Sequence, residues 1–208
     1  MKHVRFYYIR HGRTEFNRDG IIQGGLVDSP LVEESKPQIE ATARALMGVD
    51  ITRCYSSPLG RAMETARIVL AGRDVDVQPL EDLREFEFGS IDGLPHKEHA
   101  HEFLGCYMRQ DFSPVGGEKG SQVRERVARA FQRMYEESED GQNVLVVAHG
   151  SLFRYVFLNY CHASPLRKAV LSRTTRVPNA SISVLDGVDG RIGNTQHGRR
   201  SDARCDLF

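Results

Sequence analysis

The chain has 208 residues, of which 40% are apolar, and its 28 lysines and arginines balance its 28 aspartates and glutamates to a net charge of zero. This length and composition are typical of one globular domain, and a neutral chain lacks the positive field with which proteins hold nucleic acid or anionic lipid. Apolar runs such as VLVVA at 144–148 are far too short to span a membrane, so we expect a cytoplasmic protein with no nucleic-acid and no membrane partner.

The first predicted element is a β-rich strand at residues 4–9, which Arg10, His11 and Gly12 follow at once. The strand therefore delivers two basic side chains at its carboxyl end, which is the edge where α/β sheets bind ligands. After a loop rich in Gly and Pro, a helix is predicted over 38–47.

Ser35, which precedes this helix, and Gln38, its first residue, have capping-box spacing. Gly48, which follows the helix, is a stop signal. A second strand is predicted at 51–57. Pro58 then opens a helix that runs to Gly72.

Arg61 falls in the first turns of that second helix, and residues 74–80 are predicted to form an edge strand. Residues 85–120 have no clear periodicity, so we expect a long, partly helical lid. Apolar residues at 123, 127, 131 and 134 then predict an amphipathic helix that Ser121 caps.

Residues 144–148 form a continuous β-branched run that indicates a strand buried on both faces, and His149 and Gly150 end it before a helix over 151–160. A last strand is predicted at 180–186. The residues after it contain too few apolar side chains to build an element of their own.

This order of elements predicts an α/β fold: a three-layer α/β/α sandwich with a mostly parallel central sheet and a lid insertion. We expect one domain over 1–190, with the lid at about 86–120 and a polar C-terminal tail at 191–208. The sequence carries no signal for an oligomeric state.

Four basic residues follow or adjoin strand ends and are therefore expected to converge at one edge of this sheet: Arg10, His11, Arg61 and His149. Guanidinium groups match phosphate oxygens, and an imidazole beside a bound phosphoryl group can attack phosphorus directly. The pattern predicts a phosphate pocket in which one histidine attacks phosphorus while the other histidine and both arginines hold the transferring oxygens.

Four blocks in this chain resemble the histidine phosphatase superfamily, the phosphoglycerate mutase-like proteins: RHGRTEFN at 10–17, SSPLGRAMETA at 56–66, LREFEFG at 83–89 and AHG at 148–150. Four spaced blocks in the expected order are more specific than any single motif. The resemblance implies a three-layer fold with no metal or other cofactor. It also implies that His11 is the nucleophile, which forms a phosphohistidine, and that Arg10, Arg61 and His149 hold the phosphate.

The resemblance also implies roles for residues whose chemistry the pattern alone does not assign. Glu85 would donate a proton to the leaving oxygen, and Asn17, Gln23, Gly24 and Gly150 match positions that line the phosphate pocket. Segments such as LVEES at 31–35 depart from the family pattern, so no substrate is carried over from a subfamily.

The expected function is hydrolysis of a small phosphorylated metabolite. The alternatives are a cofactor-dependent phosphoglycerate mutase and a catalytically inactive domain that only binds a phosphorylated ligand. A phosphatase is favoured over a mutase because the stretch between Glu85 and His149 is short and because Arg109 is the only arginine of the lid. Side chains expected at the pocket mouth are Lys97, Arg109, Lys119, Phe88, Phe103, Tyr107 and Phe112.

Two other patterns suggest different chemistry. The histidines at 96, 99 and 101 are weak metal-site candidates because no carboxylate or thiol stands at matching spacing. Cys161 and Arg167 have the C-x5-R spacing of cysteine-dependent phosphatases, but no glycine lies between them to aim backbone amides at phosphate. The four cysteines lie far apart, which favours reduced thiols.

Overall fold

The computed structural model describes residues 1–160 and 177–194, and its centre is a six-stranded sheet in the order β3-β2-β4-β1-β5-β6. The first four strands in chain order are parallel; β5 runs antiparallel to β1, and β6 antiparallel to β5. The strands are β1 (His3–Arg10), β2 (Ile51–Ser56), β3 (Val77–Pro79), β4 (Asn143–Ala148), β5 (Ile182–Val188) and β6 (Arg191–Asn194).

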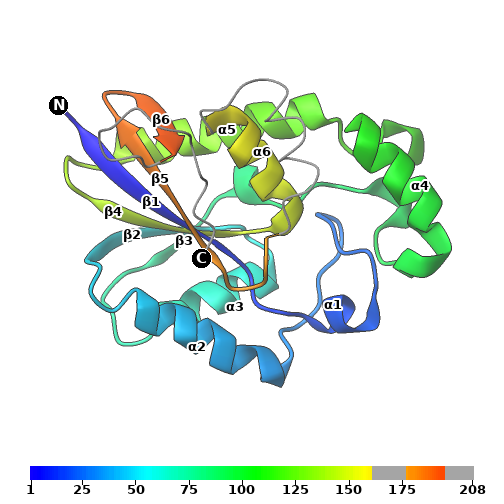
Figure 1. Ribbon diagram of the computed structural model, residues 1–208, viewed down its shortest axis with the longest axis horizontal. Helices are drawn as coiled ribbons and strands as arrows, with labels where there is room; N and C mark the ends of the chain where they lie inside the picture. Colours follow the sequence, from blue (N-terminus) through cyan, green and yellow to red (C-terminus); the bar gives the residue numbers. More distant parts are fainter. Residues whose placement is uncertain (161–176, 195–208) are drawn as a thin grey trace, which may run out of the picture.

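Helices cover both faces of this sheet: α2 and α3 lie below it in the view of Figure 1, and α5 and α6 lie above it. The predicted three-layer α/β/α fold with a mostly parallel sheet is therefore confirmed. None of the described helices is long and apolar enough to cross a membrane. The helices are α1 (Glu15–Asp19), α2 (Lys36–Ala45), α3 (Gly60–Val69), α4 (His96–Arg109), α5 (Gly120–Glu137) and α6 (Gly150–Tyr160).

The hydrophobic pattern explains the layers. Residues Val144–Ala148 of β4 are all buried, because this strand lies inside the sheet and is covered by helices on both faces. The expected apolar stripe of α5, with Val123, Val127, Phe131 and Met134, is likewise fully buried. A second buried cluster on the opposite face joins residues of α2 and α3 to the sheet.

Neither predicted serine caps its helix with its hydroxyl, although Ser35 does stand at the N-cap position of α2. The hydroxyl of Ser35 accepts a hydrogen bond from the backbone N–H of Arg13 at 2.8 Å instead of capping α2, which begins after a short 3-10 turn. Ser121 lies inside α5, whose first residue is Gly120. A tertiary contact therefore takes the Ser35 hydroxyl away from the helix that it precedes, whereas α5 begins one residue before Ser121.

The expectation that no element follows the strand at 180–186 is also wrong. β5 is followed by β6 through a tight turn in which Asp189 and Gly190 have φ angles of 48° and 77°. Positive φ at both central residues is the geometry of a two-residue hairpin, and an Asp-Gly pair is its strongest local signal. The polar tail therefore does not begin at residue 191; residues 195–208 lie outside the described part.

The carboxyl edge of the parallel strands positions the site. β1 and β4 are neighbours in register, with Arg10 beside Ala148, so the residues that follow both strands emerge together. Beyond this edge α4 and α1 lie opposite each other across the end of the sheet (Figure 1). The predicted excursion at 85–120 is thus partly helical, and α4 is its main element.

Candidate active site

His11 and His149 lie next to each other because they follow neighbouring parallel strands. The backbone N–H of His11 donates to the Ala148 carbonyl at 2.9 Å, and the two imidazole centroids are 5.2 Å apart. Nδ1 of His11 is 2.7 Å from the Gly12 carbonyl oxygen. Because a carbonyl oxygen only accepts, Nδ1 carries the proton, and Nε2 of His11 is left with a free lone pair.

The surroundings keep both imidazoles neutral. Burial, followed by the positive charges of Arg61 and Arg10, lowers the pKa of His11 well below its ordinary value. Burial and Arg61 likewise lower the pKa of His149, with smaller contributions from its other charged neighbours. A neutral imidazole with a free Nε2 is a competent nucleophile, whereas a protonated imidazole is not.

Arg61, in the first turn of α3, has a guanidinium that the protein holds in one orientation. Its side chain is 0% exposed, and its Nη1 donates to Asp28 Oδ1 at 2.7 Å and to the Val27 carbonyl at 3.0 Å. Its Nη2 donates to the Gly24 carbonyl at 3.0 Å. The buried Nε has no hydrogen-bond partner among the described residues.

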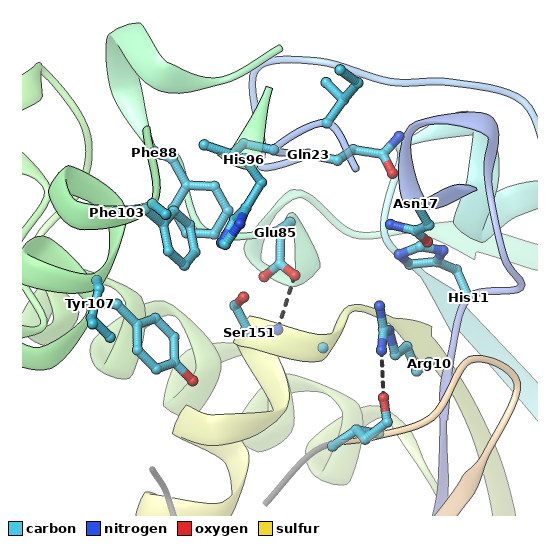
Figure 2. Close-up of a pocket in the computed structure, with 16 residues that line it drawn as sticks. Arg10, His11, Asn17, Gln23, Glu85, Phe88, His96, Phe103, Tyr107 and Ser151 are labelled. Carbon is cyan, nitrogen blue, oxygen red and sulfur yellow. Dashed lines mark hydrogen bonds between the residues drawn. The ribbon is translucent and has the colours of Figure 1, made fainter. Parts of the chain in front are cut away.

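Arg10, the last residue of β1, lies over the start of α6. Its Nη1 donates to the carbonyl of Val177, which Figure 2 shows as a dashed line. A Cβ on Gly150 would lie 3.1 Å from Nε of Arg10, a tight contact, so the glycine leaves room for the guanidinium. The Nε of Arg10 also has no hydrogen-bond partner in the described chain.

Buried polar atoms without partners gather at this point of the molecule. Within residues 1–160 and 177–194 they include Nε of Arg10, Nε of Arg61 and both ring nitrogens of His149. Buried donors are normally satisfied, so such a group requires an explanation. All three side chains can donate to oxygen, and they surround the His11 ring closely enough for their charges or dipoles to affect it. The arrangement fits a tetrahedral oxyanion.

Glu85 is buried at the N-terminus of α6. Its Oε1 accepts hydrogen bonds from the backbone N–H groups of Phe86 at 2.9 Å and Leu152 at 2.8 Å, and its Oε2 accepts one from Ser151 at 3.0 Å. Burial raises the pKa of Glu85, although these amides and the nearby arginines oppose the shift. A carboxyl group that stays protonated at higher pH is suited to act as a general acid.

Arg126 of α5 holds the segment that carries Glu85, and the sequence pattern missed it. Its guanidinium donates to the carbonyls of Arg84 at 2.6 Å and Glu85 at 3.1 Å, and it pairs with both carboxylate oxygens of Glu118 at 2.9–3.0 Å. On an amphipathic helix an arginine is normally a solvent-facing residue, so no local signal marks this one.

The expected pocket residues divide into two groups. Asn17, Gln23 and Gly150 line a cavity together with Arg10 and His11, whereas Gly24, Arg61 and His149 are not among its lining residues.

Gly24 instead supports Arg61 through its carbonyl and donates its N–H to Asp92 at 2.7 Å. A Cβ there would lie only 2.5 Å from the Phe86 carbonyl oxygen, so glycine is required by close packing.

Asn179 and Asp92 are further residues that the sequence did not indicate. Nδ2 of Asn179 donates to the His11 carbonyl at 2.9 Å and is 3.4 Å from Oδ1 of Asn17. Asp92 accepts from the backbone N–H groups of Gly24 and Phe88, which ties together two loops. Burial raises the pKa of Asp92 to about 6.

The cavity has a volume of about 620 Å³, which is the size of a small-molecule site. Of the side chains expected at its mouth, Phe88, Phe103 and Tyr107 line it, whereas Lys97, Arg109, Lys119 and Phe112 do not. Its lining consists of Arg10, His11, Asn17, Ile21, Ile22, Gln23, Glu85, Phe88, His96, Ala100, Phe103, Leu104, Tyr107, Gly150, Ser151 and Val177.

The histidines of α4 do not form a cluster. His96 lines the cavity, His99 lies 3.4 Å from Glu102, and His101 is exposed. No group of three potential metal ligands occurs in the described part of the chain. The C-x5-R pattern at Cys161 and Arg167 lies outside the described residues.

The fold and the site define a class of protein: a three-layer α/β/α domain in which a neutral histidine and a cluster of cationic donors meet at the carboxyl edge of the sheet. A family model for the histidine phosphatase superfamily, branch 1, matches residues 6–197. The chain belongs to this superfamily, as its four sequence blocks indicated.

The chain is similar to proteins whose names give different activities. Fructose-2,6-bisphosphatase TIGAR B of Danio rerio is 33% identical over 183 residues, 70% of each chain. A 2,3-bisphosphoglycerate-dependent phosphoglycerate mutase of Gloeobacter violaceus is 30% identical over 193 residues, 88% of each chain. The structure of mycobacterial glucosyl-3-phosphoglycerate phosphatase superposes with a TM-score of 0.79 at 26% identity and covers 100% of this chain and 99% of that one.

The lowered pKa of His149 predicts a specific pH dependence of stability. Because the folded-state pKa lies below the unfolded value of about 6.5, the unfolded chain binds a proton that the folded chain does not bind as the pH falls below 6.5. The wild type should therefore lose stability relative to His149→Gln on acidification. Thermal melting of both proteins between pH 7.5 and 5 measures this difference. A melting temperature of the wild type minus that of the variant that stays constant or rises as the pH falls would contradict the prediction.

Proposed function

We propose that this protein is a metal-independent phosphatase that hydrolyses small phosphomonoesters through a phosphohistidine on His11. The observation that carries the proposal is the position of a neutral imidazole, with its Nε2 free, beside the unpartnered donors of Arg10, Arg61 and His149. Such a site supplies both a nucleophile and charge stabilisation for the equatorial oxygens of a transferring phosphoryl group.

In the first step, Nε2 of His11 attacks phosphorus while the bond from phosphorus to the leaving oxygen breaks. Arg10, Arg61 and His149 donate to the non-bridging oxygens, and protonated Glu85 transfers its proton to the leaving oxygen. In the second step, water attacks the phosphohistidine and Glu85, now a carboxylate, takes the proton from that water. Breaking the bond from phosphorus to Nε2 releases phosphate and restores His11.

The protein's own cations support the metal-free part of the proposal. In many phosphoryl-transfer enzymes a divalent cation neutralises the developing charge. Here two fixed guanidinium groups are placed to serve the same purpose, one of them locked by Asp28 and two backbone carbonyls. A cytoplasmic location and the absence of nucleic-acid partners stay predictions.

The test is release of inorganic phosphate from a panel of phosphorylated metabolites, assayed with excess chelator. Activity that survives chelation supports the proposal, and activity that requires added Mg²⁺ or Mn²⁺ contradicts its metal-free part. A parallel incubation with 3-phosphoglycerate and a trace of the bisphosphate follows both 2-phosphoglycerate and free phosphate. Isomerisation much faster than phosphate release would identify a mutase while leaving the role of His11 intact.

A further inference from the structure

The cavity has two chemically different ends (Figure 2). At one end lie Arg10, Asn17 and Gln23, whose side chains can donate to phosphate oxygens, together with the proposed nucleophile His11. At the other end the wall is built mainly by α4 and is largely apolar, apart from His96, whose ring meets Phe103 edge-on at 5.3 Å. This aromatic wall consists of Phe88, Phe103 and Tyr107, and the other apolar side chains of the lining include Ile21, Ile22, Ala100 and Leu104.

Glu85 lies between the two ends in this view, with its carboxylate facing the cavity (Figure 2). In the proposed mechanism, Glu85 donates its proton to the oxygen that bridges phosphorus and the organic group. If the phosphoryl group lies against Arg10 and His11, this bridging oxygen falls near Glu85. The organic part of the substrate then extends onto the aromatic wall.

The aromatic wall is rigid because its rings hold one another. Phe103 stacks on Tyr107 with centroids 5.8 Å apart and meets Phe88 edge-on at 5.1 Å. The guanidinium of Arg154, itself buried, lies 4.5 Å from the Tyr107 ring, and Phe88 packs on Phe112 at 4.8 Å. A preformed wall of this kind binds a ligand without first paying the entropy of ordering its own side chains.

We infer that the substrate is a phosphomonoester with one anionic group, whose leaving group is a flat, apolar or aromatic moiety held by Phe88, Phe103 and Tyr107. The inference rests on the proposed phosphatase function. An apolar group gains by leaving water for this wall, whereas sugar or glycerate hydroxyls would give up hydrogen bonds to water. Among the described lining residues Arg10 is the one lysine or arginine, and it serves the phosphoryl end.

The experiment compares esters whose alkoxide leaving groups have similar basicity, so that chemical reactivity does not hide binding. The probes are 2-phenylethyl phosphate, ethyl phosphate, glycerol 3-phosphate and 3-phosphoglycerate, each followed by phosphate release. Burial of one phenyl ring predicts a kcat/KM for 2-phenylethyl phosphate roughly 30-fold above that for ethyl phosphate. Glycerol 3-phosphate and 3-phosphoglycerate should not exceed ethyl phosphate.

Variants of α4 connect this preference to the aromatic wall. Phe103→Ala should lower the ratio of kcat/KM for 2-phenylethyl phosphate to that for ethyl phosphate about tenfold. Because Phe103 also packs inside the protein, Leu104→Ser provides a second test at a position that is 56% exposed, and it should lower the ratio roughly threefold. Met108→Ser, one turn further along α4 at a 44% exposed position outside the cavity lining, is the matched control.

The outcomes of these assays distinguish a failure of this inference from a failure of the proposed phosphatase function. Hydrolysis of glycerol 3-phosphate or 3-phosphoglycerate with a kcat/KM at or above that of 2-phenylethyl phosphate would overturn this inference and leave the phosphatase proposal standing. An equal ratio in Leu104→Ser and Met108→Ser would also overturn it. Hydrolysis of none of the four esters would overturn the proposed function and this inference together.

Discussion

Replacement of His11 by alanine is expected to abolish hydrolysis, with kcat reduced roughly 10⁴-fold or more, as for loss of a covalent nucleophile in other enzymes. The expected cause is loss of the attacking atom that the site presents to phosphorus, the free Nε2 beside Arg10 and His149. Steady-state phosphate release by the purified variant measures the effect. The surrounding donors remain in the variant, so binding of inorganic phosphate, measured by isothermal titration calorimetry, should persist.

Rapid quenching after exposure to ³²P-labelled substrate provides an independent readout. The wild type should retain acid-labile, base-stable phosphate, which is characteristic of a phosphohistidine, and His11→Ala should retain none. His101→Ala is the matched control, since His101 is an exposed histidine of α4 outside the cavity lining. Turnover by His11→Ala at the wild-type rate, or label trapped on Cys161 instead, would refute the assignment.

Glu85→Gln is expected to reduce hydrolysis of alkyl phosphates by about 10²- to 10⁴-fold, the usual contribution of a general acid. A basic alkoxide needs a proton to leave, whereas a nitrophenolate leaves without one. The kcat/KM of the variant for an aryl phosphate should therefore fall far less than its kcat/KM for an alkyl phosphate. The measurement is the ratio of kcat/KM for ethyl phosphate to that for 4-nitrophenyl phosphate in both proteins. In the wild type the ratio should also fall as rising pH deprotonates Glu85, whose pKa is raised by burial.

The aryl substrate doubles as a control for folding. Glutamine presents an N–H₂ group where the carboxylate accepts from Phe86, Ser151 and Leu152, so one of these hydrogen bonds is lost and the variant should melt at a lower temperature. Intact aryl phosphatase activity shows that the site has survived this loss. Equal losses on both substrates would mean that Glu85 shapes the site and donates no proton.

Much of the fold was predictable because its signals are local. The fully apolar run of β4 and the stripe of α5 follow from the periodicity of buried positions in strands and helices. The errors occurred where a local signal had a competitor. Ser35 has capping spacing, but its hydroxyl binds the Arg13 backbone. After residue 186 the low apolar content indicates a tail, but the Asp189-Gly190 turn is a strong hairpin signal and prevails.

The sequence alone determined the phosphoryl end of the site. Arg10, His11 and His149 directly follow strands, and the carboxyl ends of adjacent parallel strands meet at one edge, so their proximity follows from chain order and topology. Arg61 lies at the start of a helix that follows a strand, so chain order and topology bring its guanidinium to the same edge. Short-range patterns suffice here because each residue is placed by the element that it terminates or begins.

Only the tertiary structure decided what surrounds that end. Glu81, Glu85 and Glu87 are equivalent by local pattern, yet only Glu85 is buried, because its carboxylate meets the amides of Ser151 and Leu152. Those partners are 66 and 67 positions away in the chain. Burial, pKa and the packing of an aromatic wall depend on contacts between distant segments, and the periodicity of a single chain does not encode which segments will meet.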